Sequence, residues 1–317
     1  MCIRDSLSAE NRGVKTYVGE NEDLELKLSA FASKIAHPAV SDLKVRFNGV
    51  DVYDVFPREL PDLFYGQELA VYGRFKGEAD AVVIIEGKRA GENAVIRHNA
   101  VFRGDDKAAD LPRLWATQKI AQLLEDIRIE GETQALKDEV VRLARKYGVI
   151  TPYTSMLVLE DEEAGRRPRI LSEAVQAGSA ASGIDGARRL QRAVDEAKMG
   201  FREKEGGRAV EASKSISDMA AEKPSAPGTV APGWRDDAVR KTIETAVKRF
   251  PEKTFYLVAD YWQDADFDLG KHKVTEVRFL SEEYFELLKQ HPGIGQYLAL
   301  GDKVIVLVGG RAWKIMP

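Results

Sequence analysis

Residues that often carry out catalysis are sparse in this chain and widely separated. The four histidines are His37, His98, His272 and His291, and the one cysteine is Cys2. The histidines lie near the ends of expected elements, where surface or turn roles are more common, because catalysis requires a paired base or a ligand geometry. The sequence also contains no GxSxG, HExxH, P-loop or GxGxxG motif. We therefore predict no catalytic residue, no cofactor-binding residue and no enzymatic activity.

One acidic segment invites a metal-site interpretation. The sequence DADFDLG, from Asp264 to Gly270, places carboxylates at alternating positions, as a calcium-binding loop does. An EF-hand loop requires Gly at its sixth position and Glu at its twelfth, whereas counting from Asp264 makes Gly270 seventh and Thr275 twelfth. We interpret the segment as a solvent-exposed acidic turn, the usual role of a local charge cluster, and predict no metal ligand.

Aromatic side chains could bind a ligand by stacking, and five of them stand out: Trp115, Trp234, Trp262, Trp313 and Tyr153. Large aromatic side chains more often fill a hydrophobic core, because each removes a large apolar area from water. We therefore predict that these residues pack in the interior and do not form a binding site.

The composition restricts the class of protein. The chain has 317 residues, of which 44% are hydrophobic and 31% charged, with a formal net charge of -4. This composition is typical of globular protein with two or three domains. The mixed charges provide no concentrated basic patch, so we predict no nucleic-acid partner. The sequence has no apolar run of about 18 residues, so we predict no transmembrane segment.

The first six residues look like a non-native start. The sequence MCIRDS back-translates readily to a transposon end that is used to prepare sequencing libraries. We expect the native sequence to start near Leu7, which makes Cys2 non-native. A cysteine-free chain would have no disulfide, thiol nucleophile or thiolate metal site.

The strongest local signals lie between Leu111 and Asp161 and predict two helices followed by a strand. Pro112 suits a first helical turn, and apolar residues then recur at the helical period as far as Ile127. Thr133 can cap a second helix that Gly148 ends. We expect this helical hairpin to dock on a sheet through Trp115, Leu123 and Tyr147, and Tyr153 to anchor the return.

Strand signals fill the preceding segment. From Val40 apolar and polar residues alternate, and the pair Asn48 and Gly49 predicts a tight hairpin to the strand that follows it. Further strands are expected at 68–75, 81–86 and 93–103. No crossover helices separate them, so we predict an antiparallel β-sandwich, which a strand at 155–159 would complete.

The C-terminal segment from Trp234 predicts a small α+β module. We expect a helix at 236–250, a strand at 254–259, a turn, a strand at 273–279 and a helix at 281–291. Two strands joined by a hairpin at Gly309 and Gly310 should end it. Proline-rich sequence at 223–233 separates this module from helical, charged sequence that begins beyond residue 186.

Three motifs resemble bacterial relatives of the inter-alpha-trypsin inhibitor heavy chains. They are VYDVFPRELPDLFYGQELAVYGRF at 52–75, LPRLWATQKI at 111–120 and KYGVITPYTSMLVLED at 146–161. In those proteins these motifs follow a von Willebrand factor A (VWA) domain. The resemblance covers 7–161 well and extends more loosely to the segment from Lys253. It implies an exported adhesion or interaction protein of the VIT/VWA type, of which this chain holds the rear portion.

The resemblance also suggests an identity for the helix expected at 23–35. Leu24, Leu28, Phe31 and Ile35 lie on one face of this helix, which looks like the last helix of a VWA domain. Without the domain's sheet the apolar face should be exposed, so that the helix frays or mediates self-association. The alternative is an independent N-terminal helix that packs on the following segment.

The resulting prediction is an α+β fold with four regions. Residues 1–36 hold the non-native start and the remnant of a VWA-like domain. Residues 37–161 form an antiparallel β-sandwich with a packed helical hairpin, 162–233 a helical and low-complexity linker, and 234–317 the small α+β module.

Together, the resemblance and the missing catalytic motifs predict a non-enzymatic structural and interaction region, located extracellularly, at the cell surface or in the periplasm. Its protein partner is unknown. The DxSxS pattern of a metal-ion-dependent adhesion site is absent, so the divalent cation of a full-length parent would bind upstream of this chain. Two alternatives are a hydrolase with an unrecognised site in the C-terminal module and an intracellular VWA scaffold protein.

Overall fold

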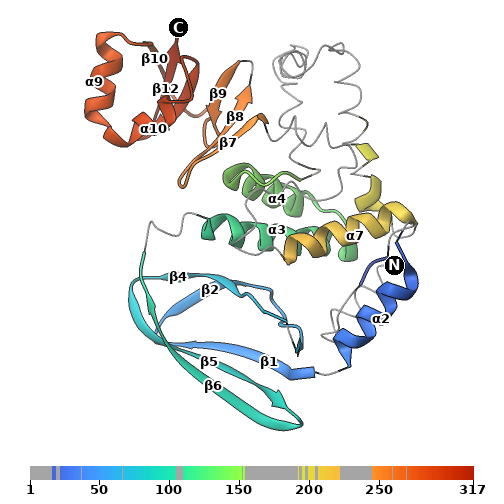
Figure 1. Cartoon of the computed structure of the whole chain (residues 1–317). Helices are drawn as coiled ribbons and strands as arrows, with labels where there is room; N and C mark the ends of the chain where they lie inside the picture. Colours follow the sequence, from blue (N-terminus) through green and yellow to red (C-terminus); the bar gives the residue numbers. More distant parts are fainter. Residues whose placement is uncertain are drawn as a thin grey trace. The chain divides into compact units, whose positions relative to one another are not determined.

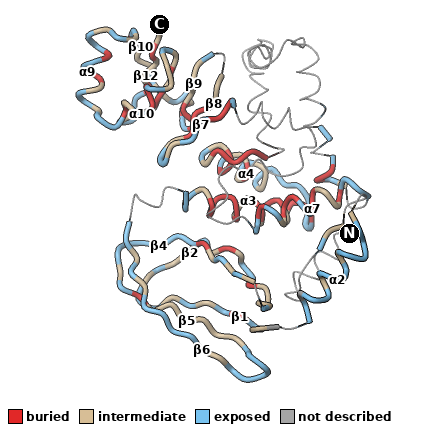
Figure 2. The backbone as a smooth tube through the Cα atoms, in the orientation of Figure 1, coloured by how far each residue is buried: buried red, intermediate tan, exposed pale blue. Residues whose placement is uncertain are grey.

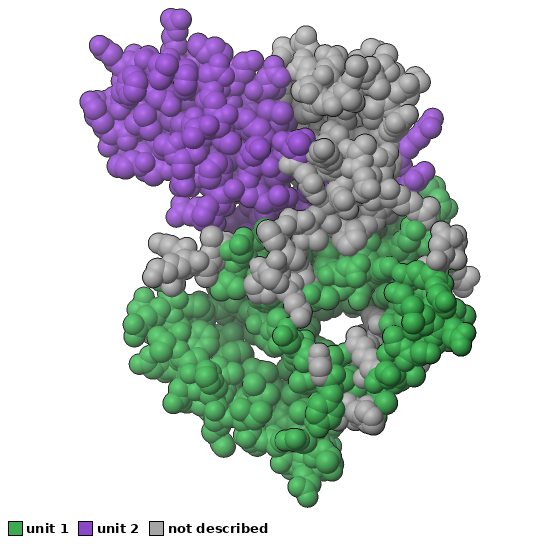
Figure 3. Space-filling model, viewed as in Figure 1, with its two compact units in different colours: residues 1–137, 199–233 green, residues 138–198, 234–317 purple. Residues whose placement is uncertain are grey.

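The computed structural model describes residues 16–18, 22–36, 38–65, 67–104, 110–151, 153, 192, 195–196, 199–203, 206–221, 245–258, 260–268 and 270–317. The chain forms two compact units, which Figure 3 shows in green and purple. Unit 1 comprises 1–137 and 199–233, and unit 2 comprises 138–198 and 234–317. The predicted α+β fold class is confirmed. The division into four regions remains a prediction.

Unit 1 contains two antiparallel sheets (Figure 1). The larger sheet has the order β3-β1-β5-β6, with bounds Leu63–Phe64, Pro38–Asn48, Ala79–Arg89 and Glu92–Phe102. The smaller sheet pairs β2 (Asp51–Phe56) with β4 (Tyr72–Lys76). The ring of Phe102 lies 6.2 Å from that of Phe47 and 5.2 Å from that of Phe75, so aromatic contacts join the sheets. The predicted antiparallel sheets are confirmed.

The predicted hairpin at Asn48 and Gly49 is wrong. Asn48 pairs with Val82 of β5, and Asp51 pairs with Lys76 of β4, so β1 and β2 lie in different sheets. Gly49, at a φ of +97°, lets the chain leave one sheet for the other. A strand pair depends on which strands can share a buried face, and this requirement overrides a local turn signal. The strand predicted at 155–159 lies outside the described residues.

Two helices form the most buried part of unit 1, as the red segments of Figure 2 show. Helix α3 (Leu111–Glu130) begins with a proline in its first turn, as predicted, and contacts α7 (Gly207–Ala220). The buried guanidinium of Arg128 donates to the carbonyl oxygens of Gly200 and Ala209 and to Oγ of Ser213. These bonds satisfy a charge that would otherwise be costly to bury.

Helix α2 (Leu24–Ile35) begins at Asp23, whose side chain accepts a bond from the backbone N–H of Leu26. Leu24, Leu28 and Ile35 are exposed, with exposed fractions of 57%, 53% and 40%. The predicted exposure of the apolar face is confirmed at these residues, whereas Phe31 is half-buried. No described helix is long and apolar enough to cross a membrane.

Unit 2 is built on a six-stranded sheet with the order β10-β12-β11-β9-β8-β7. The strand bounds are Val274–Arg278, Arg311–Met316, Val304–Val308, Tyr261–Asp264, Thr254–Val258 and Val247–Arg249. Helix α9 (Glu282–Gln290), a 3-10 turn (Pro292–Ile294) and α10 (Gly295–Leu298) supply side chains to its core. The predicted cap at Ser281 and the hairpin at Gly309 and Gly310 are confirmed.

Two predictions for unit 2 need correction. Val247–Arg249 is strand β7 and not the end of a helix, because Val247 pairs with Tyr256 and is buried. The expected turn between the first two strands contains β9, which pairs in parallel with β11. Residues 236–244, where the helix was expected to begin, lie outside the described residues.

Helix α4 (Gln134–Tyr147) belongs to unit 1 as far as Lys137 and to unit 2 beyond it. In unit 2 its C-terminal carbonyl groups accept bonds from β7 and β8. Thr254 Oγ1 donates to Lys146 O at 2.9 Å, Tyr256 Oη to Arg145 O at 2.9 Å, and Arg249 Nε to Gly148 O at 3.0 Å. Burial raises the pKa of Tyr256, which keeps its phenol protonated as the donor. The bonds satisfy carbonyl groups that have no partner within the helix.

Candidate interaction surface

The residues of two sequence motifs meet where α3 covers β2 and β4. The indole Nε1 of Trp115 donates to the backbone oxygen of Asp54 at 2.8 Å, and its ring lies 6.4 Å from that of Phe56. Asp54 has a φ of +49° and lies where the register between β2 and β4 shifts. This bulge interrupts the regular pairing of β2 with β4 at Asp54, whose carbonyl group accepts the hydrogen bond from the indole.

Charged side chains complete this contact. The guanidinium carbon of Arg74 lies 5.4 Å from the ring centre of Tyr53 and 5.2 Å from that of Trp115. Lys119 Nζ lies 5.3 Å from the Trp115 ring and 3.1 Å from Asp54 Oδ2. Cations over aromatic faces are attracted by the ring quadrupole. We call Tyr53, Asp54, Arg74, Trp115 and Lys119 the tryptophan joint.

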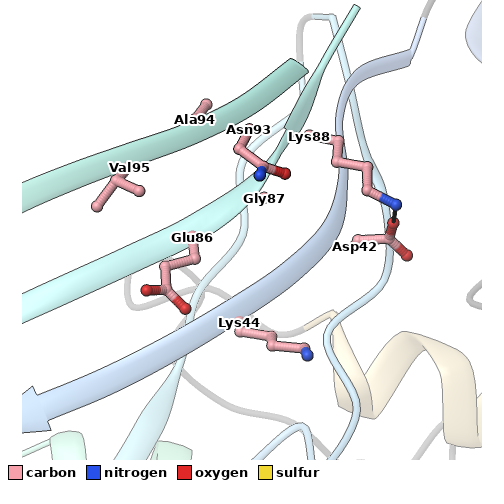
Figure 4. A pocket seen from close by; sticks show the side chains of 8 residues that line it. All are labelled: Asp42, Lys44, Glu86, Gly87, Lys88, Asn93, Ala94 and Val95. Atoms are coloured by element: carbon pink, nitrogen blue, oxygen red, sulfur yellow. Dashed lines mark ion pairs between the residues drawn. The ribbon is translucent and has the colours of Figure 1, made fainter. Parts of the chain in front are cut away.

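A polar hollow of about 490 Å³ opens on the face of the larger sheet that carries Lys44 and Glu86 (Figure 4). We call this face the outer face. Its lining residues come from β1, β5 and β6: Asp42, Lys44, Glu86, Gly87, Lys88, Asn93, Ala94 and Val95. A side chain at Gly87 would approach Val40 Cγ1 to 2.5 Å and Ser41 O to 2.9 Å. Glycine is therefore required where the bulged strand β1 crosses β5.

The carboxylates of the hollow have cationic partners. Asp42 Oδ2 lies 2.8 Å from Lys88 Nζ, and the hydrogen bond to Asp42 raises the pKa of Lys88. Glu86 pairs with Arg46. Lys44 forms no ion pair with a described residue. No histidine, cysteine or serine is among the lining residues, and the two carboxylates, the groups that could act as general bases, are both held in ion pairs.

The prediction that the segment from Asp264 is a solvent-exposed turn is wrong for Asp264, Ala265 and Phe267, which are buried. Asp264 is buried, and its Oδ2 pairs with Lys253 Nζ at 2.6 Å and accepts from Leu307 N at 3.0 Å. Asp268 pairs with Lys271, and this bond is the main cause that lowers the pKa of Asp268. No group of three histidine, cysteine or acidic side chains in the described residues could hold a metal ion.

The three histidines that the structure describes have separate local settings. His98 is exposed on β6, and His291 follows the last residue of α9. The ring of His272 hydrogen-bonds through Nδ1 to the backbone of Asp268 and stacks on Phe267. His37 lies outside the described residues.

The predicted packing is confirmed for three of the five aromatic residues. Trp115 is 5% exposed, and Trp262 and Trp313 pack against the core of unit 2. Leu123 is buried in α3, whereas Tyr147 and Tyr153 belong to unit 2. The predicted docking of Tyr147 and Tyr153 on the sandwich remains a prediction. Trp234 lies outside the described residues. Sequence reasoning missed Arg74, because Tyr53, Arg74 and Trp115 come from three separate segments.

Part of the chain is similar in sequence to known proteins. Inter-alpha-trypsin inhibitor heavy chain H4 of Bos taurus is 28% identical over 171 residues, which are 50% of this chain and 19% of that protein. Heavy chain H3 of Rattus norvegicus is 27% identical over 176 residues, with the same two shares. Heavy chain H2 of Sus scrofa is 28% identical over 183 residues, 53% of this chain and 19% of that protein.

The chain spans about a fifth of the length of these relatives. No family model and no solved structure matches the chain. Over about half its length, the chain is distantly similar to the inter-alpha-trypsin inhibitor heavy chains, as the three motifs predicted.

Proposed function

We propose that this chain is a non-enzymatic structural and interaction region of an exported, adhesion-type protein with a VWA domain. The observation that carries the proposal is that residues from two of the three sequence motifs, 52–75 and 111–120, contact one another in the tryptophan joint. The indole N–H of Trp115 bonds to Asp54 O, and Lys119 pairs with the carboxylate of Asp54. These contacts hold helix α3 on the smaller sheet. A catalytic base would instead have to reach a substrate.

The names of the relatives support an assembly role. They are called heavy chains of an inhibitor, which describes subunits. This chain spans about a fifth of those proteins, and we propose that it shares a role in assembly with them. We propose an extracellular, cell-surface or periplasmic location on the same basis.

The location can be tested on host cells with an antibody against the chain. Protease treatment of intact cells should remove the antibody signal while leaving a cytoplasmic marker protein undigested. Signal that is protected in intact cells and recovered with the cytoplasmic fraction would contradict export and favour an intracellular scaffold. Release from the periplasm by osmotic shock would still support export.

The divalent cation of the proposed parent protein should bind outside this chain. Calorimetric titration with Mg²⁺ or Mn²⁺ is expected to show no stoichiometric site of micromolar affinity, because the sequence lacks the DxSxS pattern. Detection of such a site would contradict this prediction.

We also propose that α2 mediates self-association. Leu24 and Leu28 expose apolar surface on one helix, and burial of a leucine side chain is worth about 1.5–3 kcal/mol. Light scattering after gel filtration should show a mass that rises with concentration. Leu28→Lys should abolish the rise, whereas Leu280→Lys, at an apolar residue of unit 2 that is 60% exposed, should not. A monomer at all concentrations would refute this role of α2.

A further inference from the structure

Among the strands that the structure describes, β6 forms a long edge of the larger sheet in unit 1. It has 11 residues and pairs with β5 without interruption from Glu92 to Phe102. Among the described strands β6 pairs with β5 alone. The other edge strands are short, with two residues in β3, three in β7, five in β4 and β10 and six in β2. Proteins commonly shorten, bend or cover an edge, because its free N–H and C=O groups can pair with another strand.

This edge lacks several of the usual protections. The β5–β6 ladder has no register shift, and β6 contains no proline. Apolar side chains on the strand are exposed, with exposed fractions of 47% for Val95, 60% for Ile96 and 62% for Val101. A regular strand with exposed apolar side chains and a free edge can accept an added strand.

The charged residues along β6 favour an acidic partner strand. Arg97 is exposed in the middle of β6 and forms no ion pair with a described residue. His98 is exposed on the opposite face of the strand. The acidic residues nearby are Glu92 at the start of β6, Asp80 of β5, which pairs with Val101, and Glu86 of β5, which pairs with Val95 and forms an ion pair with Arg46. An antiparallel second copy of β6 that is centred on Arg97 would place two guanidinium groups opposite each other, which is unfavourable. A carboxylate opposite Arg97 would be favourable.

We propose that β6 binds an extended segment of another protein, and that this segment is acidic at its centre and apolar on either side. Val95, Arg97 and Val101 alternate onto the outer face, so one face of the added strand meets all three. An antiparallel partner would place a carboxylate opposite Arg97. It would place apolar residues four positions before that carboxylate, opposite Val101, and two positions after it, opposite Val95.

The inference deepens the proposed interaction role, on which it rests, by naming a partner class. It requires neither self-association through α2 nor a particular cellular location. A failure of strand binding would leave the antibody and light-scattering results unchanged, so the two proposals can fail separately.

The test uses the full chain and two blocked synthetic peptides of about nine residues, a length suited to a strand. One peptide has glutamate opposite Arg97 and valine opposite Val95 and Val101, with threonine elsewhere. The matched peptide has lysine in place of the glutamate. Fluorescence anisotropy should show tighter binding of the glutamate peptide by about fivefold, the effect of exchanging an opposite-charge for a like-charge cross-strand pair.

Charge reversal supplies the decisive comparison. Arg97→Glu should invert the preference, so that the lysine peptide binds about fivefold more tightly, and Arg97→Gln should remove it. Lys289→Glu, at an exposed residue of α9 with a side chain 75% exposed, should leave both affinities unchanged. Circular dichroism of each variant should match the wild-type chain, because Arg97 is exposed.

Hydrogen exchange then locates the contact. The bound glutamate peptide should protect amides of β6 that exchange in the free chain. Three results would overturn the proposal: no binding of the glutamate peptide, binding that Arg97→Glu leaves unchanged, or protection of β6 by increasing protein concentration alone. The last result would assign the edge to a second copy of the chain.

Discussion

The larger sheet of unit 1 and the six-stranded sheet of unit 2 differ in how completely their apolar faces are covered. In unit 2 the central strands hold Val304, Val306 and Ile315 with no exposed surface. In the larger sheet of unit 1 Leu43 and Ala81 are buried, but Ile96 is 60% exposed. Both sheets have strand-forming sequences, so strand formation alone does not create a core. The strand binding that we propose falls on the incompletely covered sheet.

Within unit 1 the burial is concentrated in α3, and the tryptophan joint links this helix to the smaller sheet. The largest expected effect is therefore that of Trp115→Ala, which should lower the free energy of unfolding by about 3–5 kcal/mol, the range for truncating a buried aromatic residue. Denaturant unfolding, with hydrogen exchange to assign each transition to a unit, would measure it. Trp115→Phe keeps a ring but loses the bond to Asp54 O, so its cost should be smaller. An unchanged transition for Trp115→Ala would place the indole outside the core.

A matched pair of isoleucines tests the comparison of the two sheets directly. Ile315→Ala in β12 should cost about 2–5 kcal/mol, because Ile315 has no exposed surface and its removal leaves a cavity. Ile96→Ala in β6 should change stability by no more than about 0.5 kcal/mol. Equal costs in urea denaturation would show that another surface covers Ile96 in solution.

Local patterns predicted many elements, because periodicity and capping depend on neighbouring residues. Helix α3 follows from Pro112 and the recurring apolar residues, and α9 from the cap at Ser281. Pairing depends on distant segments, and for this reason the signal at Asn48 and Gly49 predicted the wrong partner. The short strand β7 offered too few residues to reveal its period.

The same reason limits prediction of the candidate surface. The sequence predicted a buried role for Trp115, because an indole removes a large apolar area from water. It could not place Arg74 between Tyr53 and Trp115, since this arrangement arises when β2, β4 and α3 assemble. The hollow likewise depends on the irregular pairing of β1 with β5 near Ser41.

A smaller effect is expected where α4 ends in unit 2. Gly148 has a φ of +65°, and an added Cβ would lie 2.9 Å from Arg249 Nε and 3.1 Å from Thr254 Cγ2. Gly148→Ala should cost about 1–2 kcal/mol from the backbone conformation, plus the cost of displacing those side chains. Gly91→Ala is the control, because its φ is +85° and no atom lies within 4 Å of the added Cβ. If both substitutions cost the same in thermal unfolding, the close contact at Gly148 contributes nothing.

A small electrostatic effect is expected at Glu132, which lies between α3 and α4. The hydrogen bond from Lys137 is the main cause that lowers the pKa of Glu132, and Arg202 adds to it. Because the folded state lowers this pKa, the stabilisation is present above the usual value of 4.5 and is lost as the pH falls through the folded-state pKa. Glu132→Gln should cost no more than about 1 kcal/mol at pH 7, the range for surface ion pairs. The difference from the wild-type chain should shrink in acid and in high salt. Denaturant unfolding across this pH range would measure it, with Glu25→Gln on α2 as the control for loss of an exposed carboxylate. A difference that persists unchanged in acid would mean that Glu132 stabilises unit 1 through packing and not through its charge.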